Sequence, residues 1–389
     1  MLRFLTAGES HGRGLVVIVE GLPAKLPVTV EAVADELARR RLGYGRGPRM
    51  RFERDELVLL GGVRHGRTIG SPVAITIGNA EWERSDRWHE EMSPAPGATK
   101  APLTTPRPGH ADLSGMQKFG FDDARDVLER ASARETAARV AGGALAKALL
   151  AELGITVVSH VVGIGPVASK SPERPGSDDL ERVDASEVRC FDADAEQAMI
   201  HEIKAAAHDG DSLGGVVEVI AYGVPVGLGS HVHWDRKLDG LVAGALMSIH
   251  AVKGVEIGDG FESAARRGSE AHDPIAWDRE GGTYRRLSTR AGGIEGGIST
   301  GEPVIARVAM KPLATLNRPV LQTVDVATKE ETVSFRERTD VTAVPAMGVV
   351  AETMVALVLA GEALRKFGGD SLDEVVRNRD AYVAGLSGA

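Results

Sequence analysis

Three stretches of the first half of the chain recur in the same order in the second half, and this repeat limits the possible folds more than any other feature. GRGLVVIVEGLP resembles GGVVEVIAYGVP, GSPVAITI resembles GEPVIARV, and ERASA and ERTDV each lie shortly before a long apolar stretch. The paired segments begin at Gly12 and Gly214, at Gly70 and Gly301, and at Glu129 and Glu337. Any one match could arise by chance, but three matches in one order favour a duplication.

A duplication of this kind predicts one domain over residues 1–389, built from two intertwined repeats. The repeats cover roughly residues 1–160 and 208–368, and a polar connector lies at 166–186. Mixed, hairpin-like strands with few strict strand–helix alternations favour an α+β fold over a doubly wound parallel sheet.

Local patterns predict the elements that carry these repeats. The first 20 residues are predicted as a strand, and further strands are predicted at 56–60 and 71–77. A helix is predicted to begin after an N-cap at Thr29 and to end at Gly43. Residues 78–110 contain five prolines and little periodicity, which predicts a long surface loop.

Composition places the chain among soluble proteins. Hydrophobic residues make up 43% of the 389 residues and charged residues 26%, and no apolar run approaches the roughly 20 residues of a membrane span. The single cysteine, Cys190, excludes an internal disulfide or a CxxC centre. The N-terminus lacks a secretory signal, so we expect a cytoplasmic protein.

Arginine is unevenly distributed. The chain has 35 arginines against 11 lysines, and nine of the arginines lie between Arg39 and Arg67, although the formal net charge is −9. A local arginine cluster in an acidic protein predicts a small anionic ligand more than a nucleic acid, which usually requires a broad basic face. Neither a phosphate-loop motif nor a GxGxxG dinucleotide motif is present.

Several side chains could carry chemistry. His11 lies in GESHG and could be a simple turn histidine, whereas His110 in PRPGHAD lies between Arg107 and Asp112, where it could titrate beside a bound anion. His231 is two residues from His233, but no third ligand is evident nearby, so no metal site is predicted.

Residues 126–153, rich in alanine and free of proline, predict one long helix. On that helix Arg130 and Arg134 would lie one turn apart on one face, either as an anion site or as a solvated, ion-paired surface. Lys311 and Thr315 in KPLAT could present an ammonium and a hydroxyl to a phosphate.

Taken together, these segments resemble the chorismate synthase family over about residues 1–375. The resemblance rests on GESHG, RRRLGYGRGPRM, RPGHADLSGMQKFG, ERASARETAARVAGG, DGDSLGGVVE, KGVEIGDGF, AGGIEGGISTGEP, MKPLATL, RTDVTAVPA and KFGGDS, which occur in family order. It implies a β-α-β sandwich with an internal pseudo-two-fold axis, assembled as a homotetramer. It also implies conversion of 5-enolpyruvylshikimate 3-phosphate to chorismate and phosphate, an anti-1,4-elimination with loss of a C6 hydrogen that requires reduced FMN as a transient electron donor.

The resemblance assigns roles to individual residues. His11 would protonate the departing phosphate, His110 would supply a proton near the flavin ring, and Asp340 would act in removing the C6 hydrogen. The substrate-binding residues would be Arg40, Arg46, Arg49, Arg107, Arg134 and Arg338. NADPH, if it binds as a reductant, would contact Arg40 and Arg46. The FMN contacts would be Arg130, Ala131, Ser132, His250, Ala251, Gly296, Lys311, Pro312, Leu313, Ala314, Thr315 and Arg338.

Two positions depart from the family pattern. The flavin turn usually reads KPIST or KPISS, so Ala314 replaces a serine hydroxyl. His250 stands where a smaller or amide side chain is common. The alternatives of another class are a polyanion-binding protein that holds RNA and an ordinary flavin oxidoreductase, and only 16 aromatic residues argue against the first.

Overall fold

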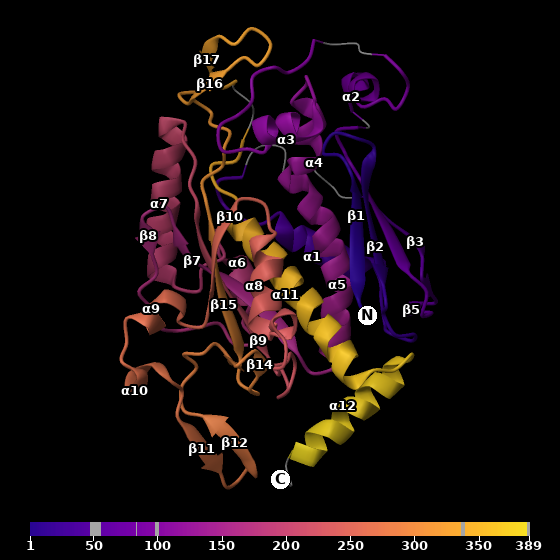
Figure 1. The fold of residues 1–389 in the computed structure, drawn as a ribbon, viewed down its shortest axis with the longest axis vertical. Coiled ribbons are helices and arrows are strands. Elements are labelled where there is room, and N and C mark those ends of the chain that lie inside the picture. Colours follow the sequence, from indigo (N-terminus) through magenta and orange to yellow (C-terminus); the bar gives the residue numbers. More distant parts are fainter. Residues whose placement is uncertain (47–55, 83, 98–100, 336–338, 387–389) are drawn as a thin grey trace.

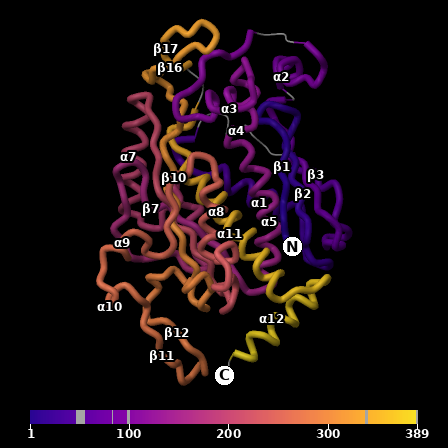
Figure 2. Tube along the Cα trace, viewed as in Figure 1, coloured from indigo at the N-terminus to yellow at the C-terminus, as the bar shows by residue number. Residues whose placement is uncertain are grey.

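Two antiparallel sheets enclose a layer of helices (Figures 1 and 2). The computed structural model describes residues 1–46, 56–82, 84–97, 101–335 and 339–386. In the middle layer, α5 packs on strands of one sheet and α11 on strands of the other. This arrangement has the α+β class that the strand pattern predicts and is the sandwich that the family resemblance implies.

The first sheet has the strand order β1-β2-β6-β3. Apolar side chains alternate along its central strands, so that Leu15, Val17 and Val19 face the helices and are buried. Its strands are β1 (Arg3–Gly8), β2 (Gly14–Glu20), β6 (Val73–Gly78) and β3 (Leu57–Gly61).

The second sheet has the order β10-β15-β9-β7-β8. Without the two-residue edge strand β8, it repeats the connectivity of the first sheet: the first strand in sequence pairs with the second, the second with the fourth, and the fourth with the third. Its strands are β10 (Val252–Ile257), β15 (Val304–Met310), β9 (Gly215–Tyr222), β7 (Thr156–Ile164) and β8 (Val167–Ala168).

The helices of the middle layer follow the same repeat. One helix comes after the second strand of each sheet and one after the fourth, so that α1 corresponds to α8 and α5 to α11. These helices are α1 (Val30–Arg40), α8 (Leu238–Met247), α5 (Thr136–Glu152) and α11 (Val344–Phe367). Two of the three sequence matches fall on corresponding strands, β2 with β9 and β6 with β15. The third pair of segments precedes α5 and α11, and Glu337 and Arg338 of that pair lie outside the described residues. In this correspondence β7 takes the place of β1, and the repeat bounds predicted from the sequence stay a prediction.

Two central helices, α5 and α11, approach each other closely because small residues line their crossing. A Cβ atom added to Gly143 would lie 2.2 Å from the Cβ atom of Thr353. Helix α11 is long and apolar enough to cross a membrane by length and composition, the only such helix in the described part of the chain. However, 89% of its most apolar stretch is buried inside the protein, as expected for the central helix of a sandwich.

The first 20 residues form two strands rather than the single strand predicted. A turn at residues 9–13 separates β1 from β2, and the two strands pair from Arg3 with Glu20 to Gly8 with Leu15. Gly8 has a φ of +101°, a conformation that glycine adopts without strain, and it allows the chain to leave β1 toward the helices.

The single helix predicted over 126–153 is also wrong, because the chain breaks at Ser132. This residue is extended, with φ −67° and ψ 142°, and its hydroxyl accepts a hydrogen bond from the backbone N–H of Arg134. A serine side chain that caps the next turn competes with continuous helix, which the alanine-rich composition conceals. The break divides the segment into α4 (Arg125–Ala131), a 3₁₀ turn (Ala133–Glu135) and α5.

The segment predicted as a loop at 78–110 contains a short helix, α2 (Asp86–Glu91), and the connector at 166–186 contains β8 and α6 (Leu180–Ala185). The helix that begins after Thr29 is confirmed, since the Thr29 hydroxyl accepts from the N–H of Ala32. The remaining elements are peripheral: β4 (Val63–Arg64), β5 (Arg67–Thr68), α3 (Asp112–Phe119), α7 (Ala193–Asp209), a 3₁₀ turn (Trp234–Arg236), α9 (Gly260–Ala264), α10 (Gly268–Ala271), β11 (Ile275–Asp278), β12 (Thr283–Arg286), β13 (Ile294–Glu295), β14 (Ile298–Ser299), β16 (Gln322–Val324), β17 (Glu331–Val333) and α12 (Leu372–Leu386).

Candidate active site

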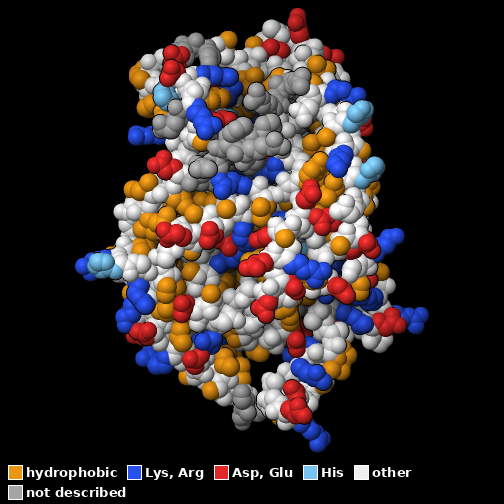
Figure 3. Space-filling view, turned by 180° about the vertical axis from the view of Figure 1, so that it is seen from behind, with side chains coloured by type: hydrophobic (Ala, Val, Ile, Leu, Met, Phe, Trp, Pro, Cys, Tyr) orange, Lys and Arg blue, Asp and Glu red, His pale blue; other side chains and the backbone are white. Residues whose placement is uncertain are grey.

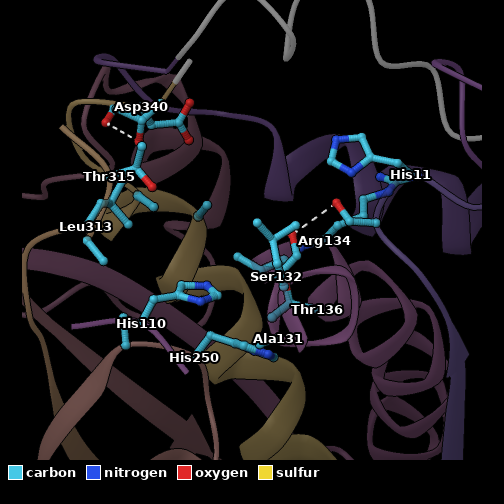
Figure 4. A pocket seen from close by; sticks show the side chains of 18 of the residues that line it. His11, His110, Ala131, Ser132, Arg134, Thr136, His250, Leu313, Thr315 and Asp340 are labelled. Atoms are coloured by element: carbon cyan, nitrogen blue, oxygen red, sulfur yellow. Dashed lines mark hydrogen bonds between the residues drawn. The ribbon is translucent and has the colours of Figure 1, made fainter. Parts of the chain in front are cut away.

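A cavity of about 940 Å³ lies where the β1–β2 turn, the end of α1 and the α4–α5 break meet several loops (Figure 4). Its described lining carries seven arginine and lysine side chains but two carboxylates, so the cavity is strongly positive. The cations are Arg40, Arg46, Arg84, Arg87, Arg107, Arg134 and Lys311, and the carboxylates are Glu81 and Asp340. Such a cavity attracts small anions that carry several charges.

His11 lies in the β1–β2 turn, and Glu129 of α4 fixes its ring. Oε2 of Glu129 accepts from the His11 backbone N–H at 2.8 Å, and Oε1 lies 2.9 Å from Nδ1 of the ring. Burial raises the pKa of the Glu129 carboxyl, but the hydrogen bonds and charge of His11 and the charge of Arg125 outweigh it and hold this pKa below its ordinary value. The His11 ring also stacks on Trp88, with 4.0 Å between the ring centroids.

His110 has a similar partner. Its Nδ1 lies 2.5 Å from Oδ1 of Asp112, a fully buried carboxylate that also accepts from Nε of Arg107 at 2.8 Å. Burial raises the pKa of Asp112, but the hydrogen bonds from His110 and Arg107 outweigh it and hold the pKa well below the ordinary range. Arg107 also donates to the hydroxyl of Thr315 at 3.1 Å, which joins this group to the 311–315 turn.

His250 and Lys311 lie near His110 on the same side of the cavity. Burial lowers the pKa of His250, and the positive charges of Arg139, His110 and Arg130 lower it further, against the opposing effect of Glu135. Burial and the neighbouring Lys253 lower the pKa of Lys311, whose ammonium donates to the carbonyl of Gly109.

Arg40 and Arg134 are fixed arginines of the cavity wall. Arg40 is 5% exposed and donates to the hydroxyl of Thr136 and the carbonyl of Ala133, both at 3.0 Å. Arg134 is 5% exposed and donates to the side-chain oxygen of Asn79 at 3.0 Å. Side chains tied down in this way hold their charge in one place before any ligand arrives.

Arg130 does not share a face with Arg134, contrary to the sequence prediction. The break at Ser132 turns Arg130 outward, where it donates to the carbonyls of Thr6 and Gly8 at 2.9 and 3.0 Å. Its side chain is 42% exposed and lies 3.7 Å from Glu135, which agrees with the alternative prediction of a solvated, ion-paired side chain for Arg130, although not on a face shared with Arg134.

Asp340 lies across the cavity from His11 (Figure 4). Its Oδ2 is 3.2 Å from Nη1 of Arg46, and the Asp340 side chain is 23% exposed. The backbone brings the two together, because the N–H of Val341 donates to the carbonyl of Gly45 at 2.8 Å. Gly45 has a φ of +84°, and a Cβ atom there would lie 2.9 Å from Ile203.

The structure brings most of the candidate residues to this one cavity. Those that line it are His11, His110, Asp340, Arg40, Arg46, Arg107, Arg134, Ala131, Ser132, His250, Ala251, Lys311, Leu313, Ala314 and Thr315. Arg130, Gly296 and Pro312 are not among its described lining residues, and Arg49 and Arg338 lie outside the described residues. No group of three or more metal-ligating side chains occurs among the residues that the structure describes, and His231 and His233 are both exposed.

Sequence reasoning missed several residues at or beside the cavity, among them Glu81 and the four that follow. Trp88, Arg84 and Arg87 come from the segment predicted as a surface loop, and Glu129 lies behind His11. The only signal for the first three was an aromatic residue between charged neighbours, which is also common on exposed surfaces.

Comparison with known proteins agrees with this geometry. The model of the chorismate synthase family matches residues 2–364. The chorismate synthase of Streptomyces coelicolor is 60% identical over 394 residues, with 99% of this chain and 98% of that protein covered, and the chorismate synthase of Thermobifida fusca is 59% identical over 396 residues, with 99% of each covered. A crystal structure of a chorismate synthase superimposes with a TM-score of 0.80 at 41% identity, covering 100% of this chain and 99% of that one. With a match of this extent in sequence and in fold, the chain belongs to the chorismate synthase family.

Proposed function

We propose that this lyase of the shikimate pathway binds 5-enolpyruvylshikimate 3-phosphate and reduced FMN together in the cavity and releases chorismate and phosphate. The observation that carries the proposal is the arrangement of His11 and Asp340 on opposite sides of a strongly positive cavity (Figure 4). An anti-elimination across a ring needs an acid on one side and a base on the other.

The residues present fit a reduced flavin. The substrate has one phosphate and two carboxylates, and reduced FMN adds another phosphate and an acidic ring, so fixed cations such as Arg107, Arg134 and Lys311 are required. Apolar lining residues, including Ala131, Leu313 and Ala314, offer a surface for the ring. When bound, reduced FMN supplies an electron to the substrate and regains it, so the reaction has no net redox change.

The protein's own groups handle protons and charge. With Nδ1 bonded to Glu129, His11 would donate a proton from Nε2 to the departing phosphate oxygen. His110, with Nδ1 bonded to Asp112, would hold a proton at Nε2 near the flavin site. Asp340 would act as the base in removing the C6 hydrogen, and a carboxylate only 23% exposed is partly shielded from water.

Two neighbours of the flavin site differ from the usual family residues. Ala314 has no hydroxyl, so Thr315 or the backbone would supply the polar contact of this turn. The pKa of His250 is lowered, mainly by burial, which favours the neutral ring. A neutral His250 would offer flavin a hydrogen bond without adding charge.

The assembly and location follow the same proposal. We expect a homotetramer in the cytoplasm, where the buried Cys190 would stay reduced. Apolar side chains on the outer face of the first sheet, Leu5, Val58 and Leu60, are 68%, 45% and 63% exposed and would suit contact between subunits. Sedimentation equilibrium would distinguish a tetramer from a monomer.

The deciding experiment is an anaerobic assay with 5-enolpyruvylshikimate 3-phosphate and chemically reduced FMN, in which phosphate and chorismate are followed together. Equal release of both products supports the proposal, and no product from folded, flavin-binding protein contradicts it. A parallel reaction with oxidised FMN and NADPH tests whether NADPH, with Arg40 and Arg46 as its candidate contacts, serves as the reductant. Steady NADPH consumption without any phosphate ester would instead indicate a flavin oxidoreductase.

An RNA-binding role has less support. On the face shown in Figure 3, basic and acidic side chains are interspersed rather than gathered into a broad basic surface. Tight binding to RNA that weakens steeply with salt would favour that alternative.

The two cavity histidines can be tested one at a time. His11→Ala and His110→Ala should each lower turnover by about tenfold or more, because each removes a proton donor to the reacting groups. Circular dichroism should show that both variants fold. A rate near that of the unmodified protein in either variant would remove that histidine from the mechanism.

A further inference from the structure

One buried carboxylate contacts both the backbone and the ring of His11. Glu129 is 3% exposed, and its two oxygens reach different groups of His11, the backbone N–H at 2.8 Å and the ring Nδ1 at 2.9 Å. The carboxylate therefore fixes the turn and the ring together. Its segment also bonds the turn through the backbone, because the N–H of Ser10 donates to the carbonyl of Glu129 at 3.0 Å.

This contact determines which ring nitrogen can exchange a proton with a ligand. An ionised carboxylate can only accept hydrogen bonds, so the hydrogen between Glu129 and the ring belongs to Nδ1. Nε2 is then the ring nitrogen at which a proton can be gained or lost. Histidine tautomers are set by the partner of the second nitrogen in many catalytic and metal sites.

Other contacts hold the same orientation. The Trp88 ring stacks on the imidazole at an angle of 17°, which fixes its plane. Arg125 lies 3.2 Å from Oε1 of Glu129 and 3.1 Å from Glu91, so the buried charge is compensated. On the cavity side, Glu81 lies 3.6 Å from Nε2 of His11.

We infer that Glu129 is a positioning residue for the elimination, which holds His11 in the tautomer and orientation that turn Nε2 toward the departing phosphate. The inference rests on the proposed role of His11. Glu129 is not among the described residues that line the cavity, so it acts through His11 rather than on the substrate.

Glu129→Gln tests this role with little change in shape. To donate from Nε2 while Nδ1–H stays bonded to Glu129, the ring must carry hydrogens on both nitrogens. The amide has one oxygen for two donors, and if its NH₂ group faces Nδ1, that nitrogen must accept, so the Nε2 hydrogen is the only one on the ring and is a much weaker acid. We expect kcat to fall by about tenfold or more, while KM for the substrate and Kd for FMN change by less than about twofold. A purely structural role would not separate kcat from KM in this way.

Glu218→Gln is the matched control. Glu218 is 2% exposed, lies on β9 and accepts from Arg174 and Arg307, but it contacts none of the cavity residues named above. The chemical change is the same, so this variant should also lose stability, but its kcat should stay close to that of the unmodified protein. If Glu129→Gln fails to fold, Glu129→Asp keeps the charge beside Arg125 and should give the same selective loss of kcat, because its shorter side chain cannot reach both groups of His11.

A double-mutant cycle that combines Glu129→Gln with His11→Ala distinguishes a positioning role of Glu129 from a purely structural one. If Glu129 acts through His11, then Glu129→Gln should not lower kcat further once His11 is removed. An equal loss of kcat in both backgrounds, or turnover in Glu129→Gln equal to that of the unmodified protein, would overturn the inference. Unchanged turnover in His11→Ala alone would instead refute the proposed role of His11, so the two failures are distinguishable.

Discussion

Two histidines from unrelated segments share one arrangement of partners. His11 contacts Glu129 and His110 contacts Asp112, in each case through Nδ1 and a buried carboxylate that an arginine also contacts. The arginine keeps the buried carboxylate ionised, and the carboxylate keeps the hydrogen on Nδ1. Each ring can therefore exchange a proton through Nε2 without rotating.

Asp340 allows the roles of charge in binding and in turnover to be separated. Asp340→Asn removes a basic oxygen and leaves the Arg46 charge, now 3.2 Å from Oδ2, without its carboxylate. The cavity becomes more positive, so KM for the anionic substrate should stay the same or fall. Turnover should fall by about tenfold or more because the proposed base is lost. Steady-state kinetics and a flavin titration measure the two effects, and loss of flavin binding in a folded variant would show that Asp340 is structural.

Sequence reasoning could identify residues that lie close together in the chain but not a contact between distant segments. His110, Arg107 and Asp112 lie within six residues of one another, so their association was visible in PRPGHAD. Glu129 is 118 positions from His11. A single sequence carries no local signal for a contact that depends on how α4 packs against the β1–β2 turn.

The break between α4 and α5 shows how one residue redirects an element. Helix propensity predicts a continuous helix there, since alanines flank Ser132 on both sides. The Ser132 hydroxyl instead caps the next turn, and as a result Arg134 faces the cavity while Arg130 faces outward. Propensity predicted that helix would form but not where it would stop, because the cap depends on the surrounding packing.

The crossing of α5 and α11 depends on the lack of a side chain at Gly143. Gly143→Ala would place a Cβ atom 2.2 Å from the Cβ atom of Thr353, so the helices must move apart. We expect the free energy of unfolding to fall by about 1–3 kcal/mol, as for other overpacked cores. Denaturant titration followed by circular dichroism gives the value.

Gly244→Ala on α8 is the control for that prediction. Gly244 is exposed, and a Cβ atom there would have no neighbour within 4 Å, so alanine should stabilise the helix by about 0.5–1 kcal/mol. Equal stability of the two variants would mean that the crossing tolerates a methyl group and that the close approach is not required.

At the scale of the whole molecule, the two sheets share one connectivity, which the three sequence matches indicated. Two matches fell on the central strands, whose helix-facing side chains are buried, and the third fell just before α5 and α11. The outer strands β1 and β7 gave no match. Their side chains meet different surroundings, because β1 has an exposed face whereas β7 is buried on both faces, so the two strands share no sequence pattern.

A buried charge network joins the two repeats. Glu352 of α11 is fully buried and accepts from Arg39 of α1 at 2.7 Å, from Lys147 of α5 at 2.9 Å and from Arg189 at 3.0 Å. Within this network three acids balance three bases, Glu36, Asp184 and Glu352 against Arg39, Lys147 and Arg189. Removing one charge leaves its partners buried without full compensation.

Glu352→Gln should therefore lower the free energy of unfolding by about 3–5 kcal/mol near pH 7. Burial raises the pKa of Glu352, but the charges of Lys147, Arg39 and Arg189 outweigh it and hold the pKa well below the ordinary 4.5. A depressed carboxyl pKa stabilises the fold fully above that ordinary value and progressively less below it. The difference in stability between the unmodified protein and the variant should thus be constant above about pH 5 and narrow as the pH falls below 4.5.

Urea titrations of both proteins across this pH range measure that difference, with Glu152→Gln as the control. Glu152 lies at the exposed end of α5, so its neutralisation should change stability by less than about 0.5 kcal/mol at each pH. If Glu352→Gln were as stable as Glu152→Gln, the buried ion pairs would stabilise the contact of α11 with α1 and α5 no more than a neutral hydrogen bond does. Apolar packing alone would then hold these helices together. A difference that stayed constant below pH 4.5 would instead mean that the carboxyl keeps its ordinary pKa, which no carboxylate bonded to three cations should do.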